Sequence, residues 1–305
     1  MKKNVLLGSG IVQEAISIHK CSAAQATHFV LCNHNKIKFI INLSDGLIRI
    51  RSNSAVYNYK LAILLRSIPF IRYKTLALFK IGYFAKIELN SQIAQYIPEN
   101  NLWNIFVGTY DDVQKIVIQC YSQNNSPCTF IKVGNASSLD QMQREIKFLR
   151  ERHTYTNLNL PTYISSSLIS EESPFNILIT KEIQAAPIQS RFTKELFQIT
   201  REIAQTSSIT KDSKKEFTHG DFAPWNIRKN ADGYTIFDWE HCGMRPVGYD
   251  AVYFIMMTEI ALKHSDFDTA FNKACEQIFQ FDKTLKINKQ EIYNEFTKTT
   301  KELIF

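Results

Sequence analysis

The feature that most constrains this chain of 305 residues is a set of polar side chains between positions 219 and 240. His219, Gly220 and Asp221 are consecutive, Asn226 follows five residues later, and Asp238-Trp239-Glu240 begins twelve residues after Asn226. Asparagine oxygens and aspartate carboxylates are hard ligands of the kind that magnesium takes, in small number, from proteins. The stretch therefore predicts a magnesium site with an additional carboxylate, Asp221, beside it.

Local structure explains how residues twelve positions apart can share a site. Residues 230–233 (Asn-Ala-Asp-Gly) have turn composition, and residues 234–237 read as a short strand that ends at Asp238. The segment around Pro224 reads as a loop entering the other strand of the same hairpin. Such a hairpin would place Asn226 and Asp238 side by side.

These residues resemble the H-G-D-x-x-x-x-N and D-W-E pattern of the aminoglycoside phosphotransferase and choline kinase family, relatives of protein kinases. The resemblance implies that Asp221 orients or deprotonates an acceptor hydroxyl, and that Asn226 and Asp238 hold Mg²⁺ on the phosphates of ATP. It gives His219, Glu240 and Asp250 supporting roles, with Asp250 bracing the catalytic loop. An ordinary turn and strand end would not explain three elements in matching order and spacing.

A kinase-like site also requires a lysine on a strand and a glutamate on the following helix. Residues 128–134 (CTFIKVG) read as a short apolar strand that carries Lys132. The next segment has apolar residues at helical spacing and carries Glu145 in its middle, thirteen positions after Lys132. We expect these two side chains to form an ion pair that grips the α- and β-phosphates, although alone each would read as a solvated surface charge.

Two further parts of a nucleotide site are expected on weaker patterns. A strand, turn and strand between residues 104 and 122 would cover the phosphates with backbone donors of Gly108, Thr109 and Tyr110. The turn has little glycine and carries Asp111 and Asp112, so a plain hairpin turn is the alternative. The resemblance alone places a nucleotide-binding hinge at residues 180–183, including Glu182 and Ile183.

The expected fold class is α+β, with the two lobes of a protein kinase behind an N-terminal accessory region. Residues 1–98 would form that region, as strands followed by basic amphipathic helices. Residues 99–184 would form a small antiparallel-sheet lobe with one helix, and residues 185–305 a mainly helical lobe with the catalytic loop. The six cysteines are scattered without a metal-binding spacing, which fits a reducing cytoplasm.

The positive charge of the chain is concentrated at its beginning. Residues 1–100 contain thirteen Lys and Arg against four Asp and Glu. Arg66, Pro69 and Arg72 interrupt the apolar stretch in residues 55–90, so it is not a transmembrane span. Two interpretations stay open: helices packed on the core, or peripheral contact with the inner face of a membrane. No pattern typical of nucleic-acid binding is present.

Charge also bears on the phosphate acceptor. A site for a polycationic drug should be rich in carboxylates, so the basic front favours a neutral or anionic acceptor. The layout also resembles, more loosely, phosphotransferase-like proteins of bacterial surface-polysaccharide synthesis, which implies a sugar or lipid-linked saccharide as acceptor. The sequence thus predicts a transferase, a kinase with an alcohol group as acceptor. The alternatives are a weakly active or inactive nucleotide-binding scaffold in glycan assembly and a choline- or aminoglycoside-type kinase.

Overall fold

The computed structural model describes residues 10–33, 36–44, 77, 81–99, 101–121, 129–151, 153–171, 173–181, 189–206, 214–231 and 233–300. Contacts within the chain divide it into two units. The N-terminal unit comprises residues 1–146 and 161–185, and the C-terminal unit comprises residues 147–160 and 186–305. Each unit has its own sheets and is described by itself.

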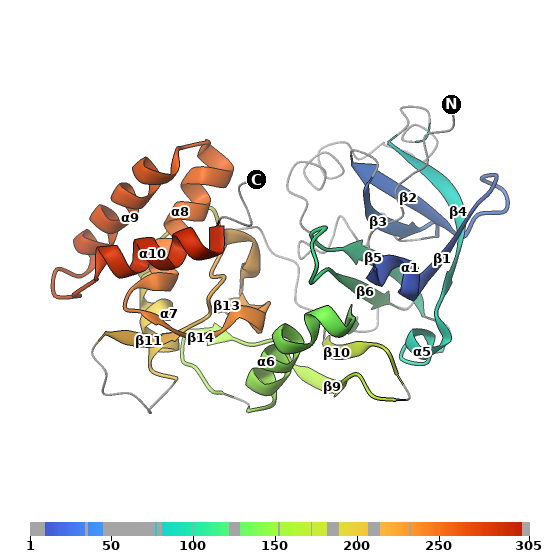
Figure 1. The fold of residues 1–305 in the computed structure, drawn as a ribbon, viewed down its shortest axis with the longest axis horizontal. Helices are drawn as coiled ribbons and strands as arrows, with labels where there is room; N and C mark the ends of the chain where they lie inside the picture. The colour runs from blue at the N-terminus through green and yellow to red at the C-terminus, as the bar shows by residue number, and fades with distance from the viewer. Residues whose placement is uncertain are drawn as a thin grey trace. The chain divides into compact units, whose positions relative to one another are not determined.

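A nine-stranded antiparallel sheet organises the N-terminal unit (Figure 1). Its strands, in spatial order, are β1 (Ile16–Lys20), β4 (Gly82–Leu89), β2 (His28–Asn33), β3 (Lys36–Asn42), β5 (Leu102–Val107), β6 (Lys115–Tyr121), β7 (Thr129–Gly134), β10 (Asn176–Lys181) and β9 (Tyr163–Ser167). Short helices α1 (Ile11–Ala15) and α5 (Ser91–Ala94) accompany it, and η1 (Ala136–Ser138) leads into α6 (Leu139–Arg150). The first four of these strands in spatial order come from the predicted accessory region and continue the sheet of the predicted first lobe.

Alternating side chains give this sheet two apolar faces. The larger core joins Ile11 of α1 to inward residues of the strands, among them Val30, Ile118 and Ile131. A second cluster, on the opposite face of β2 and β3, contains Phe29, Leu31, Phe39 and Ile41. Lys132 lies between Ile131 and Val133, both in the larger core, so its side chain points to the other face.

The prediction of helices across residues 55–90 is wrong for residues 82–89. These residues form β4, which pairs with β1 and β2. Ala85 and Ile87 are buried there, whereas Lys86 is exposed, which is the two-residue period of a strand. In the rest of residues 55–90, the structure describes Ala77, Ile81 and Asn90. The other positions of the predicted helices lie outside the described residues.

The C-terminal unit is mainly helical (Figure 1). Its helices are α7 (Lys194–Ala204), α8 (Tyr249–Lys263), α9 (Phe267–Phe281) and α10 (Lys289–Thr300). One small sheet pairs β11 (Lys215–Thr218) with β14 (Gly243–Pro246), and another joins β12 (Ile227–Asn230), β13 (Gly233–Ile236) and β8 (Leu158–Asn159). The turns η2 (Pro224–Asn226) and η3 (Trp239–His241) flank the β12–β13 hairpin.

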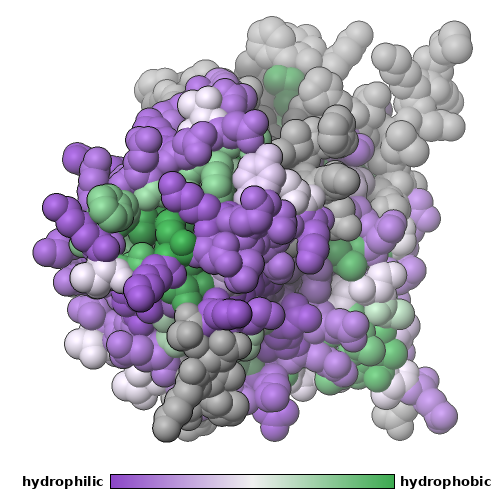
Figure 2. All heavy atoms as spheres, turned by 60° about the vertical axis from the view of Figure 1, so that its left-hand side comes forward, coloured by the Kyte–Doolittle hydropathy of each residue, from purple (hydrophilic) through white to green (hydrophobic). Residues whose placement is uncertain are grey.

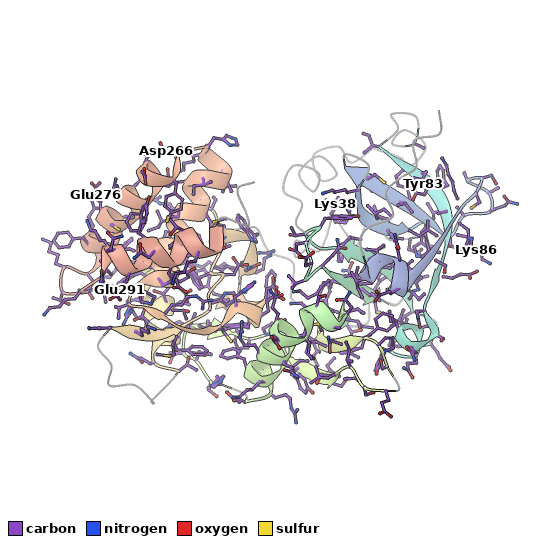
Figure 3. All side chains as sticks on the ribbon, viewed as in Figure 1. Lys38, Tyr83, Lys86, Asp266, Glu276 and Glu291 are labelled. Carbon is purple, nitrogen blue, oxygen red and sulfur yellow. The ribbon has the colours of Figure 1, made fainter. Side chains whose placement is uncertain are left out.

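The outer surface of these helices is polar. The face shown in Figure 2 is largely hydrophilic, with small apolar patches. Asp266, labelled in Figure 3, caps α9 by accepting a hydrogen bond from the Thr269 amide at 2.9 Å. Along the part of the chain that the structure describes, no helix is long and apolar enough to cross a membrane.

Candidate active site

The loop that carries Asp221 is held by a buried carboxylate. The backbone amides of His219 and Gly220 donate hydrogen bonds to Asp250 Oδ2 and Oδ1, at 2.6 and 3.0 Å. Asp250 lies in the first turn of α8 and is buried, and this burial raises its pKa to about 7 although the two amides act in the opposite direction. The contact fixes the start of the loop, between the end of β11 and η2.

Asp221 and Asn226 contact each other across this loop. Asn226 Nδ2 donates hydrogen bonds to the Asp221 carboxylate, at 2.8 Å, and to the Asp221 backbone carbonyl, at 3.0 Å. These two bonds use the amide nitrogen of Asn226, so its Oδ1 is left as the acceptor. The side-chain oxygen of Asn226 is therefore oriented by the same residue that carries the candidate base.

His219 links the loop to the hairpin. Its Nδ1 accepts a hydrogen bond from the Asp221 amide at 3.2 Å, so the proton of the neutral ring is on Nε2, which donates to the Phe237 carbonyl at 3.0 Å. Burial lowers the pKa of His219 to about 3, which keeps the ring neutral. The ring therefore positions two backbone segments and carries no charge of its own at neutral pH.

The hairpin places Asp238 beside Asn226, as its turn composition predicts. Ile227 pairs with Ile236, and the Phe237 amide donates to the Asn226 carbonyl at 3.1 Å. Asp238 follows immediately, in the left-handed backbone region with φ 72° and ψ 56°. A non-glycine residue held in this region stores strain that is common at functional sites.

The environment of Asp221 favours its protonated form. Burial is the largest cause, and the charges of Asp238 and Glu240 add to it, which together raise the pKa of Asp221 to about 7. Hydrogen bonds from Tyr253 and Asn226 oppose the shift. Sequence reasoning missed Tyr253 because α8 is apolar nearly all round; its position three residues after Asp250, on the same helix face, is the signal that could have identified it.

The chemistry of the C-terminal unit fits a divalent cation. Asp238 and Glu240 are close enough to Asp221 for their charges to raise its pKa, and such repulsion between carboxylates is relieved by a cation. Asn226, which bonds Asp221 through Nδ2, contributes an amide oxygen, and oxygen donors of these two types suit magnesium. Asn226 and Asp238 would hold the ion, and a carboxylate oxygen of Glu240 lies within 4.8 Å of one of Asp238.

The N-terminal unit contains the ion pair that the sequence predicts. Lys132 Nζ lies 2.6 Å from Glu145 Oε2, with the two side chains 15% and 4% exposed. Lys132 is on β7 and Glu145 is in the middle of α6. A lysine on a strand is thus held by a glutamate on the following helix, although its role toward a nucleotide stays a prediction.

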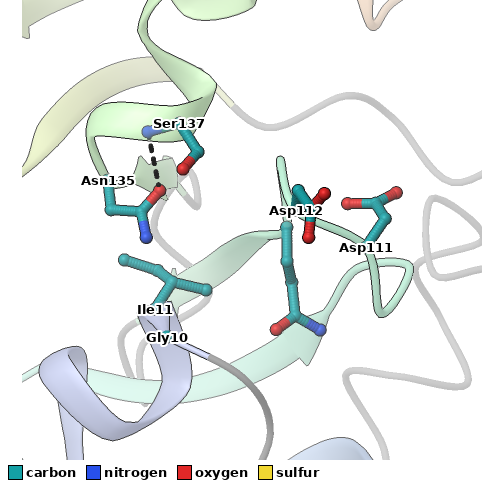
Figure 4. A pocket seen from close by; sticks show the side chains of 7 residues that line it. Gly10, Ile11, Asp111, Asp112, Asn135 and Ser137 are labelled. Carbon is teal, nitrogen blue, oxygen red and sulfur yellow. Dashed lines mark hydrogen bonds between the residues drawn. The ribbon is translucent and has the colours of Figure 1, made fainter.

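The predicted phosphate-covering loop is the turn between β5 and β6. The Gly108 amide bonds the Lys115 carbonyl at 2.9 Å, and the Tyr110 hydroxyl donates to the Ile37 carbonyl at 2.7 Å. Asp111 and Asp112 line a pocket of about 250 Å³ (Figure 4). The other residues that line it are Gly10, Ile11, Gln114, Asn135 and Ser137.

The pocket that Asp111 and Asp112 line also includes a residue of the larger core. Ile11, which shares the pocket with Asp111 and Asp112, belongs to that core, whereas Lys132 points to the opposite face of the sheet. The hinge residues Glu182 and Ile183 lie outside the described residues.

Comparison with known proteins supports the resemblance to the phosphotransferase family. Residues 174–275 match the model of the phosphotransferase enzyme family, known as APH, and this range contains His219 to Asp250. The predicted resemblance to this family is therefore confirmed for the catalytic-loop segment. No curated protein is significantly similar to the chain.

Two solved structures are similar to parts of the chain. One is the amicoumacin kinase hAmiN in complex with AMP-PNP, Ca²⁺ and amicoumacin, with 11% identity, a TM-score of 0.38, and coverage of 62% of this chain and 78% of that one. The other is the spectinomycin phosphotransferase APH(9)-Ia in complex with ADP and spectinomycin, with 13% identity, a TM-score of 0.37, and coverage of 65% and 93%.

Proposed function

We propose that the chain is a Mg²⁺-dependent kinase that transfers the γ-phosphate of ATP to a hydroxyl of a sugar or lipid-linked saccharide. The observation that carries this proposal is the hydrogen bond between Asn226 Nδ2 and the Asp221 carboxylate. It joins the candidate base to a candidate metal ligand in a loop that Asp250 holds in place. The family match over residues 174–275 supports the same reaction class.

Asp221 acts on the acceptor. Its carboxylate accepts a hydrogen bond from the acceptor hydroxyl and takes the proton as the new oxygen–phosphorus bond forms and the bond between the γ-phosphorus and the bridging oxygen breaks. A pKa raised to about 7 suits a group that takes a proton near neutral pH. Tyr253 donates a hydrogen bond to Asp221 and fixes its orientation.

The remaining groups neutralise and position the nucleotide. Lys132, held by Glu145, neutralises the α- and β-phosphates, and the backbone of Gly108, Thr109 and Tyr110 covers the phosphate tail. Asn226 and Asp238 hold the magnesium, which when bound neutralises charge on the phosphate oxygens. For Glu182 and Ile183, which lie outside the described residues, the resemblance implies a role in binding the base.

The acceptor proposal depends on charge. The excess of cations lies in residues 1–100, which disfavours a polycationic acceptor and favours a neutral or anionic saccharide. The reducing cytoplasm is the proposed location. For residues 55–90, peripheral contact with the inner face of a membrane and packing on the core both stay proposals.

Asp221→Asn tests the catalytic assignment. This variant keeps the size of the side chain and removes the base, so turnover should fall by about 10²- to 10⁴-fold while ATP affinity and the melting temperature stay close to wild type. The measurement is transfer from labelled ATP to a panel of sugars and lipid-linked glycans, with ATP affinity measured in parallel.

Asp266→Asn is the matched control, because it makes the same chemical change at a helix cap where asparagine also serves. Wild-type turnover in Asp221→Asn would contradict the proposal. Metal-dependent ATP binding by the wild type, without transfer to any acceptor in the panel, would favour a nucleotide-binding scaffold.

A further inference from the structure

Two lysines converge on the turn between β5 and β6. Lys36 Nζ and Lys38 Nζ each lie 5.1 Å from the centroid of the Tyr110 ring. The Tyr110 hydroxyl in turn bonds the backbone carbonyl of Ile37, the residue between the two lysines. The beginning of β3 and the tip of the turn are therefore tied together by three contacts to one side chain.

Among the residues that the structure describes, this pair of cations has no carboxylate as a partner. Burial of Lys38 and the charge of Lys36 lower the pKa of Lys38, so the two ammonium groups also repel each other. A tyrosine ring offsets part of this repulsion, and a bound anion would offset more of it.

Other lysines of the same sheet differ in this respect. Among the described residues, Lys20 is the single cation over the Tyr83 ring, at 5.4 Å, and Lys86 pairs with Glu88 at 3.0 Å. Lys38, Tyr83 and Lys86 are labelled on the N-terminal unit in Figure 3. Convergence of two lysines on one ring therefore distinguishes the beginning of β3 from these positions.

The turn adds backbone donors to the lysines. In the described part of the chain, the amides of Thr109 and Tyr110 have no hydrogen-bond acceptor, whereas those of Gly108 and Asp111 bond backbone carbonyls. Consecutive free amides in a turn are typical of anion-binding concavities. The carboxylates of Asp111 and Asp112, which follow Tyr110 in the turn, line the pocket shown in Figure 4.

Sheet register relates this position to Lys132. Phe39 of β3 pairs with Phe106, Phe106 with Val117, and Val117 with Lys132, so these residues form one cross-strand row. Three strand spacings correspond to about 14 Å between the backbones of β3 and β7. An anion at Lys36 and Lys38 is thus a different group from one that Lys132 contacts directly.

We propose that Lys36 and Lys38 bind a phosphate group at the tip of the β5–β6 turn. The proposal rests on the proposed function for the source of this phosphate. It is either the γ-phosphate of the nucleotide or a phosphate carried by the acceptor, and the chemistry of recognition is the same for both. The accessory strand β3 would then supply the positive charge that the glycine-poor turn lacks.

The experiment compares wild type, the double variant Lys36→Gln/Lys38→Gln and the control Lys20→Gln by isothermal titration calorimetry. Glutamine keeps most of the side-chain length and removes the charge, and Lys20→Gln makes the same change over another tyrosine ring. The probes are ATP, ADP, and inorganic phosphate added with and without ADP. Melting temperatures verify that the variants fold.

If the γ-phosphate is the source, the double variant should bind ATP about tenfold more weakly and ADP within about threefold of wild type. If the acceptor is the source, nucleotide binding should stay unchanged and the double variant should lose inorganic phosphate binding. Lys20→Gln should match wild type in both cases.

Wild-type affinities of the double variant for all three probes would overturn the proposal, and so would an equal loss in Lys20→Gln. A wild-type protein that binds neither ATP nor ADP would refute the proposed function. The phosphate titration would then test the lysine site independently. A double variant with wild-type phosphate affinity would contradict the site, and so would a wild-type protein that binds no phosphate.

Discussion

At the scale of single residues, His219 is a histidine that the fold keeps neutral. Its pKa falls to about 3 through burial, whereas an unfolded histidine titrates near 6.5. Below pH 6.5 the unfolded chain therefore binds a proton that the folded chain does not, so this residue makes stability decrease as the pH falls. Its stabilising effect is complete above pH 6.5 and is lost progressively toward pH 3.

His219→Gln should reveal this pH dependence. Glutamine can replace both hydrogen bonds of the ring without a titrating group, so the stability advantage of wild type should shrink by about 2 kcal/mol between pH 7.5 and pH 5. Urea unfolding at the two pH values, without divalent cations, measures the change. The raised pKa values of Asp221 and Asp250 act in the opposite direction in both proteins and cancel in the comparison. A constant difference would contradict the neutral state of His219.

The Lys132–Glu145 pair allows a second prediction, on stability. Removing one member of this largely buried ion pair leaves the other charge unpaired and poorly solvated. Lys132→Met should therefore destabilise the chain by about 2–3 kcal/mol, and adding Glu145→Gln should recover part of that loss. Urea unfolding of both single variants and the double variant completes the cycle. Additive losses would show that the two side chains are not coupled.

Sequence reasoning could predict Asp221 and Asn226 from the spacing of the family motif, and Lys132 and Glu145 from a strand followed by a helix. It could not identify Tyr253 or the pair Lys36 and Lys38. Tyr253 reads as one more apolar position of a buried helix, and the lysines read as solvated charges on a strand. Their importance depends on contacts with Asp221 and Tyr110, which lie 32 and more than 70 positions away, and no local pattern records such contacts.

At the scale of elements, the loop from β11 to η2 depends on a glycine. Gly220 has φ +85°, and a Cβ there would lie 2.1 Å from the His241 carbonyl oxygen. Gly233, in the β12–β13 turn, has φ +113°, but a Cβ there would meet nothing closer than 3.8 Å. The two positions share an unfavourable backbone conformation and differ in the space for a side chain.

Gly220→Ala and Gly233→Ala therefore form a matched pair. Gly233→Ala should cost about 1–2 kcal/mol, from backbone strain alone. Gly220→Ala should cost about 4 kcal/mol or more and reduce phosphate transfer, because the clash displaces the loop that carries Asp221. Thermal unfolding and turnover measure the two effects. Equal costs would show that the space around Gly220 does not matter.

Helices and strands were predictable where the spacing of apolar residues matched either the helical or the two-residue strand period. The alternation through Ile116, Ile118 and Cys120 predicted β6, and the apolar spacing after Ser138 predicted α6. The helix prediction across residues 82–89 was wrong because the order of apolar residues and lysines there fits both the helical period and the two-residue period of a strand. Pairing with β1 and β2 decides the outcome, and that information is non-local.

At the scale of the whole molecule, the nine-stranded sheet makes the first strands part of the N-terminal unit. Residues of α1 and β2 share one core with residues of β6 and β7. Removing residues 1–98 would uncover the edge of β5 and take away much of that core. The fragment 99–305 should therefore aggregate or lose cooperative unfolding, as measured by size-exclusion chromatography and circular dichroism.

The control is the full chain cut between Glu99 and Asn100, which breaks the backbone and keeps every strand. It should remain one particle with a cooperative transition, because β3 stays paired with β5. A monomeric fragment 99–305 with a sharp thermal transition would contradict the structural importance of the first strands.

Trp239 has an optical consequence. Its indole is fully buried, donates a hydrogen bond to the Ile236 carbonyl, and lies 4.1 Å from the Phe148 ring and 4.5 Å from the His219 ring. It also follows Asp238 directly and is one of three tryptophans in the chain. The fluorescence of this indole therefore reports on the surroundings of Asp238. Replacing Trp103 and Trp225 by phenylalanine would isolate its emission, so that rearrangement around Asp238 can be followed in real time without an added label.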